Sequence, residues 1–342
     1  MIHATVTPEL KAALRNGQAI LCLSHVKPDG DAVGSLLGMA WLLRTLGKQP
    51  VLALQDAVPD EGGHLPGVDD IITGDSPNYE RVVRSRAFDL IICLDASSPD
   101  RMGTVYNPAV HRAATLLVID HHVTNTGFGA LNWVDPTSVS TTQMVAQLAD
   151  ALDAPLAGPL AICLLTGLVT DTLCFSTSNV SARTLELAMR LMDGGADLAA
   201  ITQQTVNRRP FRLIKLWSLV LPTVHLADGV VWATATPEML AQTGTPASEV
   251  GLSSYLVTAD EADMSAVFIE QINGDGTPRV ECSFRAKPGF NVAEVAFALG
   301  GGGHPAAAGC TVDGDLATVL PRVVAALQAA RGRQLAERHG AA

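Results

Sequence analysis

The sequence contains no C-x-x-C pair, so its cysteines are not spaced as redox or zinc-binding motifs. The chain has 342 residues, and its six cysteines are Cys22, Cys93, Cys163, Cys174, Cys282 and Cys310. Several of them lie inside apolar runs, where a free cysteine behaves as a small hydrophobic residue. A disulfide framework and a zinc-thiolate site are therefore both disfavoured, and a reducing compartment is expected.

Positive charge is also scarce. The chain carries 23 Lys and Arg residues against 34 Asp and Glu residues, which gives a formal net charge of −11. A protein that coats long nucleic acid needs a basic face, so this balance argues against long nucleic acid as a partner. It remains compatible with a small anionic substrate held by a few local cations or metal ions.

Long apolar runs and a targeting segment are absent as well. The longest apolar stretch, residues 156–170, is too short to span a bilayer and is followed by Asp171. The N-terminal residues MIHATVTPEL lack the basic region and apolar stretch of a secretory signal. The sequence therefore predicts a cytoplasmic protein with no membrane partner.

The first half of the chain alternates strand-like and helix-like segments. Hydrophobic residues make up 48% of the sequence, and the length is sufficient for two domains. Short continuous apolar runs between helices are typical of parallel strands that are covered on both faces. The pattern predicts a doubly wound, mostly parallel α/β sheet. Strands are expected at 19–24, 50–54, 89–94 and 115–119, with a helix at 33–46.

The second half changes character after residue 222. Helices are expected at 140–151, 156–170 and 181–192, followed by a linking helix at 199–221 that is interrupted near Pro210. Strands are then expected at 230–236, 264–272 and 279–285, and helices at 292–299 and 316–338. We therefore expect a first domain at 1–195, a helical linker at 196–222 and a smaller α/β domain at 223–335.

Acidic and imidazole side chains follow three of the predicted strands. In doubly wound sheets, ligands bind at the carboxyl ends of the strands, near the point where the strand order reverses. Residues from separate strands therefore meet at this one edge, and a further acid closes the helix at 156–170. The candidates are His25, Asp29, Asp31, Asp95, Asp120, His121, His122 and Asp171.

These residues would bring five carboxylates into one cleft. Unpaired charges removed from water cost several kcal/mol each, and only Lys27 and Arg101 are nearby in sequence. A single Asp after a strand is more often a cap or turn residue, but all of these fall at strand or helix ends. Bound divalent ions are the simplest explanation, and oxygen and imidazole ligands favour Mn²⁺ or Mg²⁺. Two ions bridged by one carboxylate can clamp a phosphoryl group.

Four motifs resemble those of a known family. The segments SHVKPDGDAVGS, LDASSPDR, VIDHHVTN and GLVTDT are similar to the N-terminal motifs of the DHH phosphoesterases. The segments SFRAK and GGGGHPAAAG resemble the signature of the DHH-associated C-terminal domain. The resemblance extends from about Leu10 to about Leu327. Within the family, the length is similar to the nanoRNase and pAp phosphatase group and to the soluble cyclic-di-AMP phosphodiesterases.

The resemblance implies a role for each candidate residue. Two Mn²⁺ ions are implied, with Mg²⁺ or Co²⁺ as possible substitutes. His25 and Asp29 would hold the first ion, Asp95 would bridge both, and Asp31, His121 and Asp171 would hold the second. Asp120 would be a supporting carboxylate, since ligand imidazoles are oriented by outer partners. His122 would face the scissile phosphate as an acid or electrophile.

The resemblance also implies a substrate site in the C-terminal domain. Arg285 and His304, with the backbone of Gly302 and Gly303, would hold the far phosphate or nucleotide end of the substrate. Glycines in such a loop let N–H groups approach an anion closely. The sequence departs from the family at Gln143, where many relatives are acidic, and at Ser176, where an arginine often stands. These departures concern substrate preference more than activity.

The expected reaction is hydrolysis of short oligoribonucleotides, pApA, cyclic di-AMP or 3′-phosphoadenosine 5′-phosphate (pAp) by two-metal activation of water. A pyrophosphatase is disfavoured because that class carries a different C-terminal domain. A RecJ-like exonuclease is disfavoured because the chain is short and lacks an obvious basic aromatic groove. A nucleotide-sensing module without turnover would have degenerate ligand positions, and here all are filled. A homodimer is expected from the resemblance alone.

Overall fold

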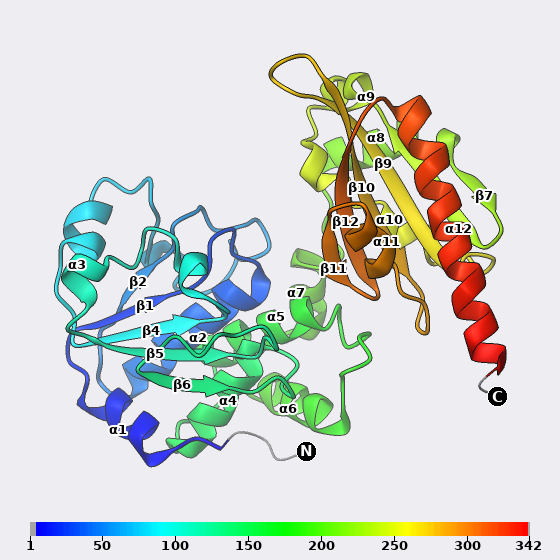
Figure 1. The fold of residues 1–342 in the computed structure, drawn as a ribbon. Coiled ribbons are helices and arrows are strands. Elements are labelled where there is room, and N and C mark those ends of the chain that lie inside the picture. The colour runs from blue at the N-terminus through cyan, green and yellow to red at the C-terminus, as the bar shows by residue number, and fades with distance from the viewer. Residues whose placement is uncertain (1–4, 341–342) are drawn as a thin grey trace. The chain divides into compact units, whose positions relative to one another are not determined.

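The chain is divided into two compact units in the computed structural model, which describes residues 5–340 (Figure 1). The first unit is Met1–Arg208 and the second is Arg209–Ala342. The division falls inside the segment 196–222 that the sequence assigns to a linker. The domain limits drawn from the sequence remain a prediction.

The first unit is built on a six-stranded sheet with the order β3-β2-β1-β4-β5-β6, in which every printed pairing is parallel. The strand order reverses between β1 and β4, so the carboxyl ends of these two strands flank the switch point. The predicted doubly wound α/β fold is therefore confirmed. The strands are β1 (Ile20–Leu23), β2 (Val51–Ala53), β3 (Ile71–Ile72), β4 (Leu90–Leu94), β5 (Thr115–Asp120) and β6 (Leu131–Val134).

Helices and short helical turns cover both faces of this sheet. One face packs against α2, α4 and α5, and the other against the turns at 80–84 and 99–102. α2 begins three residues earlier than the sequence predicts, because Asp29 accepts a hydrogen bond from the Ala32 amide at 3.0 Å and so caps it. The helices are α1 (Pro8–Asn16), α2 (Gly30–Thr45), α3 (Pro108–His111), α4 (Thr141–Ala151), α5 (Pro159–Asp171), α6 (Ala182–Asp193) and α7 (Leu198–Gln204).

Helices α2 and α5 approach each other at backbone distance. A Cβ atom on Gly34 would lie 2.8 Å from the Cys163 carbonyl oxygen and 3.0 Å from the Gly167 nitrogen, so no larger residue fits there. Gly30 lies against the side chain of Thr170, whose Cγ2 and Oγ1 atoms would be 2.5 Å from a Cβ atom there. This close approach brings the first turn of α2 beside the last turn of α5, which carry Asp31 and Asp171.

The second unit contains a mixed six-stranded sheet with the order β11-β12-β10-β9-β8-β7. Only the β8–β9 pairing within it is parallel. One face packs against α11 and α12, and the other against α8 and α10. The strands are β7 (His225–Ala227), β8 (Val230–Ala235), β9 (Met264–Ile272), β10 (Pro278–Ala286), β11 (Gly302–His304) and β12 (Ala307–Asp313). The helices are α8 (Phe211–Val220), α9 (Pro237–Thr243), α10 (Ser253–Leu256), α11 (Ala293–Ala298) and α12 (Leu316–Gly340).

One local prediction is confirmed and another is wrong. The linking helix expected at 199–221 is interrupted near Pro210 as predicted and divides into α7 and α8, because Pro210 lacks an N–H and disfavours helix in the residue before it. The glycine-rich segment expected as a loop forms the edge strand β11. A Cβ atom on Gly301 or Gly303 would overlap the backbone of β12, so close strand packing accounts for these glycines.

Across the described part of the chain, no helix combines the length and apolar character needed to cross a membrane.

Candidate metal centre

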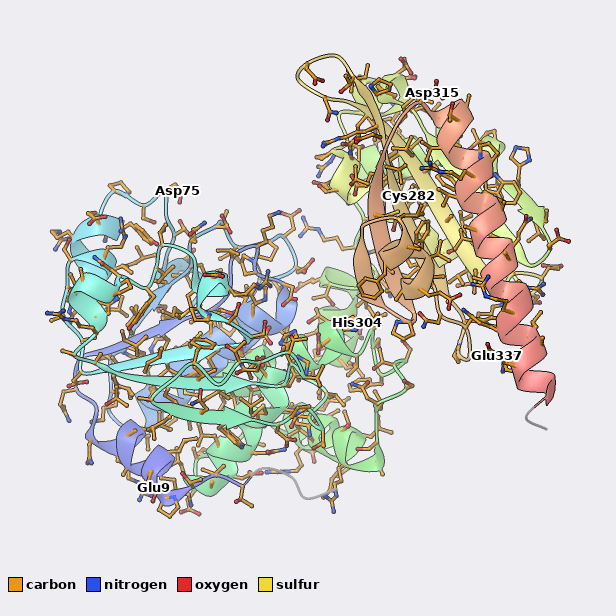
Figure 2. The ribbon with its side chains drawn as sticks, viewed as in Figure 1. Glu9, Asp75, Cys282, His304, Asp315 and Glu337 are labelled. Atoms are coloured by element: carbon orange, nitrogen blue, oxygen red, sulfur yellow. The ribbon has the colours of Figure 1, made fainter. Side chains whose placement is uncertain are left out.

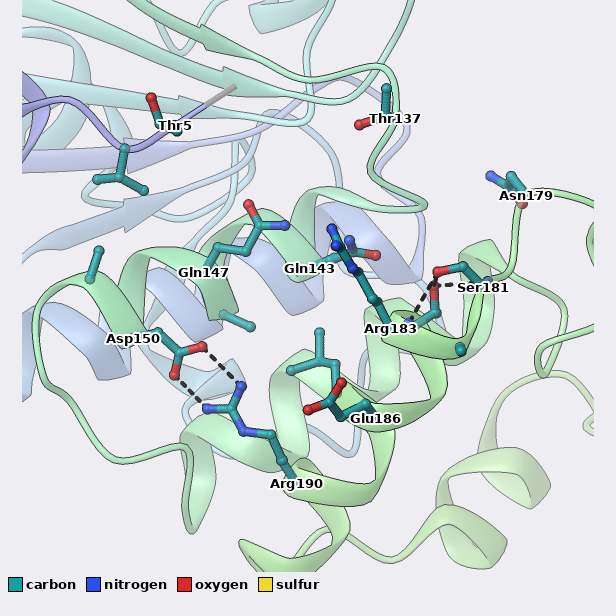
Figure 3. Close-up of a pocket in the computed structure, with 16 residues that line it drawn as sticks. Thr5, Thr137, Gln143, Gln147, Asp150, Asn179, Ser181, Arg183, Glu186 and Arg190 are labelled. Atoms are coloured by element: carbon teal, nitrogen blue, oxygen red, sulfur yellow. Dashed lines mark hydrogen bonds and ion pairs between the residues drawn. The ribbon is translucent and has the colours of Figure 1, made fainter. Parts of the chain in front are cut away.

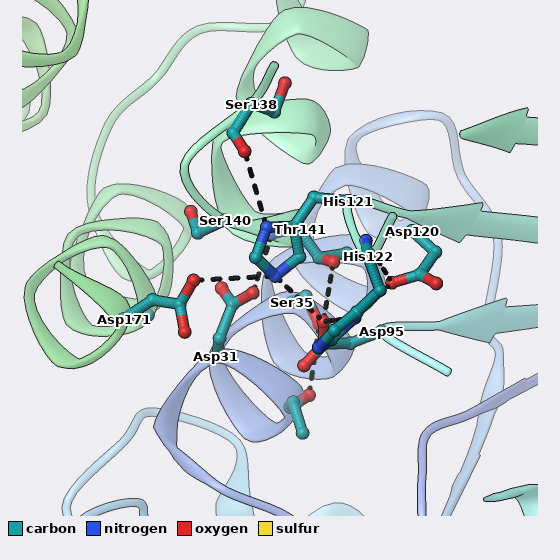
Figure 4. A network of polar contacts seen from close by, with 12 residues as sticks. Asp31, Ser35, Asp95, Asp120, His121, His122, Ser138, Ser140, Thr141 and Asp171 are labelled. Carbon is teal, nitrogen blue, oxygen red and sulfur yellow. Dashed lines mark hydrogen bonds and ion pairs between the residues drawn. The ribbon is translucent and has the colours of Figure 1, made fainter. Parts of the chain in front are cut away.

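The candidate ligands converge at the carboxyl edge of the first sheet (Figure 4). Three groups of side chains each offer ligand atoms that lie within 4.8 Å of one another. Asp95 belongs to two of the groups and His121 to two, so the groups form one continuous cluster. All six residues predicted as metal ligands are brought together in it. The groups are His25, Asp29 and Asp95; Asp31, His121 and Asp171; and Asp95, His121 and His122.

The first group joins the end of β1 to the start of α2 and the end of β4. Nε2 of His25 lies 3.8 Å from Asp29 Oδ1 and 3.5 Å from Asp95 Oδ2. Nδ1 of His25 lies 2.9 Å from the Val26 carbonyl oxygen, so Nε2 is the ring nitrogen that faces the two carboxylates. Nη2 of Arg101 approaches the same Nδ1 atom, at 3.0 Å. The imidazole is therefore oriented as a ligand.

The second group joins the end of β5 to helices α2 and α5. Nε2 of His121 lies 3.5 Å from Asp171 Oδ2 and 3.7 Å from Asp95 Oδ1. Nδ1 of His121 lies 3.3 Å from the Ser138 carbonyl oxygen, so this imidazole is also held with Nε2 toward the carboxylates. Figure 4 shows Asp31 and Asp171 on the same side of His121.

Asp120 and His122 form a separate pair beside the cluster. Asp120 is fully buried, and its Oδ1 lies 2.7 Å from His122 Nδ1. Its Oδ2 accepts a hydrogen bond of 2.6 Å from Asn125. Burial alone would raise the pKa of Asp120, but the hydrogen bonds from His122 and Asn125 hold it below its usual value. The hydrogen bond to Asp120 in turn raises the pKa of the half-exposed His122.

The N-terminus of α4 holds two of the carboxylates, a contact that sequence reasoning missed. The backbone amides of Thr141 and Thr142 donate to Asp31 at 2.6 and 3.0 Å, and the Thr142 hydroxyl donates to it at 2.8 Å. The Thr141 hydroxyl donates to Asp95 Oδ1 at 2.8 Å. The Ser-Thr-Thr run that starts α4 was the available signal, because a helix N-terminus favours a nearby anion.

Repulsion within the cluster is visible in its pKa values. Burial and the neighbouring Asp95 raise the pKa of Asp31 well above its usual value and raise that of Asp171 to about 7. Burial would lower the pKa of His25, but the carboxylates of Asp29 and Asp95 raise it to about 10. The positive side chains beside these carboxylates are therefore too few to neutralise them. Oxygen and imidazole donors crowded in this way fit a pair of Mn²⁺ or Mg²⁺ ions.

Backbone strain is concentrated at the same place. Seven non-glycine residues among those described have positive φ, and five of them lie in or close to the ligand segments. Left-handed backbone is unfavourable for residues with a Cβ atom and persists where the surroundings enforce it, often at functional sites. The five are Lys27, Asp95, Leu173, Cys174 and Phe175.

Mn²⁺ is expected to raise the melting temperature of the metal-free protein. An ion that binds only the folded state raises the free energy of unfolding by about 2.7 kcal/mol when its free concentration is 100 times Kd. For a unit of this size, that corresponds to a shift of about 5–10 °C. Thermal unfolding with and without Mn²⁺, reversed by a chelator, measures it.

Asp171→Asn provides the matched variant for the Mn²⁺ experiment. It removes one of the repelling carboxylates, so the metal-free protein should melt at the same temperature as wild type or higher, while the shift on adding Mn²⁺ shrinks. An equal Mn²⁺ shift in wild type and variant would contradict the assignment of Asp171 to the cluster.

The residues predicted to bind substrate lie in the second unit. Arg285 on β10 and His304 on β11 both pair with Ala307 of β12 in register, so the three share one face of the sheet. Arg285 is half-buried and donates to the Phe284 carbonyl oxygen at 2.9 Å. Burial lowers the pKa of its guanidinium. His304 is exposed (Figure 2), and the roles of these residues and of Gly302 remain predictions.

A groove of about 1020 Å³ runs between α4 and α6 and contains none of the predicted site residues (Figure 3). Asp150 and Arg190 face each other in it through two hydrogen bonds of 2.9 and 2.5 Å. Their charges are therefore paired internally. Gln143, one of the positions that departs from the family pattern, lines this groove.

Two family models match the chain. The DHH family N-terminal domain matches residues 19–168, and the DHHA1 domain matches residues 243–331. The chain belongs to the DHH family, and the resemblance seen in its motifs is confirmed.

Two relatives and one solved structure make the comparison more specific. The "bifunctional oligoribonuclease and PAP phosphatase NrnA" of Thermus thermophilus is 32% identical over 316 residues, which are 90% of this chain and 89% of that protein. The NrnA of Mycoplasma pneumoniae is 27% identical over 305 residues, 89% of this chain and 90% of that protein. An exopolyphosphatase-related protein from Bacteroides fragilis shares the fold, with a TM-score of 0.82, 22% identity and 94% coverage of both chains.

Proposed function

We propose that this chain hydrolyses phosphoesters of short oligoribonucleotides and of pAp to release mononucleotides. The observation that carries the proposal is the place of Asp95 between the two ligand groups, with Oδ2 3.5 Å from His25 Nε2 and Oδ1 3.7 Å from His121 Nε2. A shared carboxylate is what two adjacent ions require, and two adjacent ions suit in-line displacement at phosphorus. The similarity over nine-tenths of the chain to a protein named as an oligoribonuclease and PAP phosphatase supports the choice of substrate. Linear pApA and cyclic di-AMP both contain phosphodiester bonds between adenosines and are included.

Each ligand group would hold one ion, and Asp95 would contact both. His25 and Asp29 complete the first group, and Asp31, His121 and Asp171 the second. Mn²⁺ is the proposed ion, with Mg²⁺ or Co²⁺ as substitutes. When bound, the ions supply positive charge to phosphoryl oxygens and acidity to water at neutral pH. Thr141 and Thr142 keep Asp31 and Asp95 in place through their hydrogen bonds.

His122 would act on the substrate directly. Asp120 accepts a hydrogen bond from Nδ1 of the half-exposed His122, which would leave Nε2 for the substrate. A proton held at Nε2 can be donated to an oxygen of the scissile phosphate as negative charge develops there. Asp120 fixes the orientation of the ring, and Asn125 fixes that of Asp120. His122 is therefore assigned as the catalytic acid and Asp120 as its positioning residue.

The remaining assignments concern the second half of the chain. We assign 1–195 to the catalytic domain, 196–222 to the linker and 223–335 to the substrate domain. Arg285, His304 and the amides of Gly302 and Gly303 would bind the distal phosphate or nucleotide. As an edge strand, β11 has amides that are not all used in pairing with β12, which supports this role. A cytoplasmic homodimer without long nucleic acid or membrane partners completes the proposal.

A panel of substrates tests the proposed function. Wild-type protein in Mn²⁺ is incubated with pAp, pApA, cyclic di-AMP, pyrophosphate and a long single-stranded RNA, and products are separated by chromatography. We expect AMP from pAp and pApA, and none after chelation. Rapid release of phosphate from pyrophosphate would instead indicate a pyrophosphatase, and progressive shortening of the long RNA an exonuclease. Tight binding of cyclic di-AMP with no turnover of any substrate would indicate a sensor.

A further inference from the structure

A left-handed turn follows directly after Asp171. Leu173, Cys174 and Phe175 have φ values of 47°, 57° and 63°. Consecutive left-handed residues with Cβ atoms are rare, because this conformation brings each Cβ too close to the following carbonyl oxygen. The surroundings must therefore enforce the turn, and such enforced strain is often linked to function.

Buried hydrogen bonds fix this turn. The fully buried Thr172 donates its hydroxyl to the Leu168 carbonyl at 2.6 Å and accepts from the Phe175 amide at 2.9 Å. The Cys174 amide donates to the Val169 carbonyl at 2.8 Å. The side chains of Cys174 and Phe175 pack against the main core of the first unit. The turn is thus anchored on both sides of its first left-handed residue.

Leu173 is left in solvent by this arrangement. Its side chain is 62% exposed, although its neighbours are packed inward. Two trans peptide bonds separate it from Asp171, so their Cα atoms are at most about 7.6 Å apart. Its carbonyl accepts a hydrogen bond of 2.7 Å from the Ser176 hydroxyl, which further restricts the backbone. A strained, rigid segment therefore displays one exposed apolar side chain two residues after Asp171, a member of the charged cluster.

We propose that Leu173 contacts the nucleoside of the substrate and sets the preference for nucleotides over simple phosphates. This inference rests on the proposed function. The carboxylates and ions can recognise only phosphate, whereas the flat face of a base and the carbon side of a ribose need an apolar partner. Leucine has no hydrogen-bonding groups, so the contact does not distinguish one base from another. The strain holds this side chain out of the core, where a leucine would otherwise gain stability by burial.

Direct binding separates this role from catalysis. The affinities of AMP and of inorganic phosphate are measured by titration calorimetry in Mn²⁺ for wild type, Leu173→Gly and Leu173→Met. Glycine removes the side chain and relieves the strain, because it adopts positive φ freely. Methionine keeps an apolar side chain of similar size. Leu185→Ala, at a half-exposed leucine on α6, is the control.

We expect Leu173→Gly to weaken AMP binding about tenfold and to change phosphate binding by no more than about twofold. Its melting temperature should not fall, and Leu173→Met and Leu185→Ala should bind as wild type does. Unchanged AMP binding in Leu173→Gly would overturn the inference, as would an equal loss for AMP and phosphate. If wild type hydrolyses pApA but Leu173→Gly binds AMP normally, this inference alone fails. If wild type hydrolyses no substrate, the proposed function fails.

Discussion

Asp95→Asn is expected to lower the Mn²⁺-dependent hydrolysis of pApA by at least about 1000-fold. Asp95 is the one carboxylate shared by the groups of His25 and of His121. An amide has no negative charge and cannot serve both ions, so the two would no longer be held as a pair. Asparagine is preferred to alanine here because Asp95 has a φ of 60°, a conformation that asparagine tolerates. The hydroxyl of Thr141 can still donate to the amide oxygen.

Asp100→Asn is the matched control for this substitution. Asp100 lies five residues further along the same segment, is exposed, and belongs to none of the ligand groups. Asp100→Asn removes the same charge as Asp95→Asn but at a position outside the ligand groups, so its kcat should remain close to that of wild type. Circular dichroism should show both variants folded. Near-normal turnover by Asp95→Asn would refute the two-ion assignment.

Gly34→Ala is expected to destabilise the first unit by about 2–3 kcal/mol, the cost of forcing an extra carbon into a packed core. The new Cβ would lie 2.8 Å from the Cys163 carbonyl oxygen, and a backbone atom cannot move aside as a side chain can. Helices α2 and α5 would be pushed apart, which also separates Asp31 from Asp171. The melting temperature and the affinity for Mn²⁺ should therefore fall together.

Gly332→Ala is the control, and its expected change in unfolding free energy has the opposite sign. Gly332 is also inside a helix, α12, but it is exposed and a Cβ atom there would meet nothing within 4 Å. Helix propensity alone predicts a gain of up to about 1 kcal/mol for glycine to alanine. Chemical denaturation of both variants gives the two changes in unfolding free energy. Equal effects at Gly34 and Gly332 would show that the α2–α5 contact is not tight.

The arrangement of the first sheet was predictable because its strands carry a strong signal. The runs at 20–23 and 90–94 are apolar on both faces, and the charged residues after them fall where parallel strands end. The strands that were missed include β3, which has two residues, and β11, which is rich in glycine and has no such pattern; β6, β7 and β12 were missed as well. Short strands are held by their neighbours in the sheet rather than by their own composition.

The candidate ligands were predictable, whereas the contacts that position them were not. Acids and imidazoles at strand ends stand out in a sequence. The hydrogen bonds of Thr142 to Asp31 depend on where α4 lies in space, which periodicity does not reveal. The tight fit of Gly34 against α5 depends on the same packing. The positive φ of Leu173 could not be predicted from the sequence for another reason, because leucine has no local preference for that conformation.

The central claim is that two divalent ions account for the crowded carboxylates at the sheet edge. Anomalous diffraction from a crystal grown with saturating Mn²⁺ tests it most directly. We predict two anomalous peaks per chain, one bound by His25, Asp29 and Asp95 and the other by Asp31, His121 and Asp171, with Asp95 touching both. A single peak, or none among these residues, would contradict the claim.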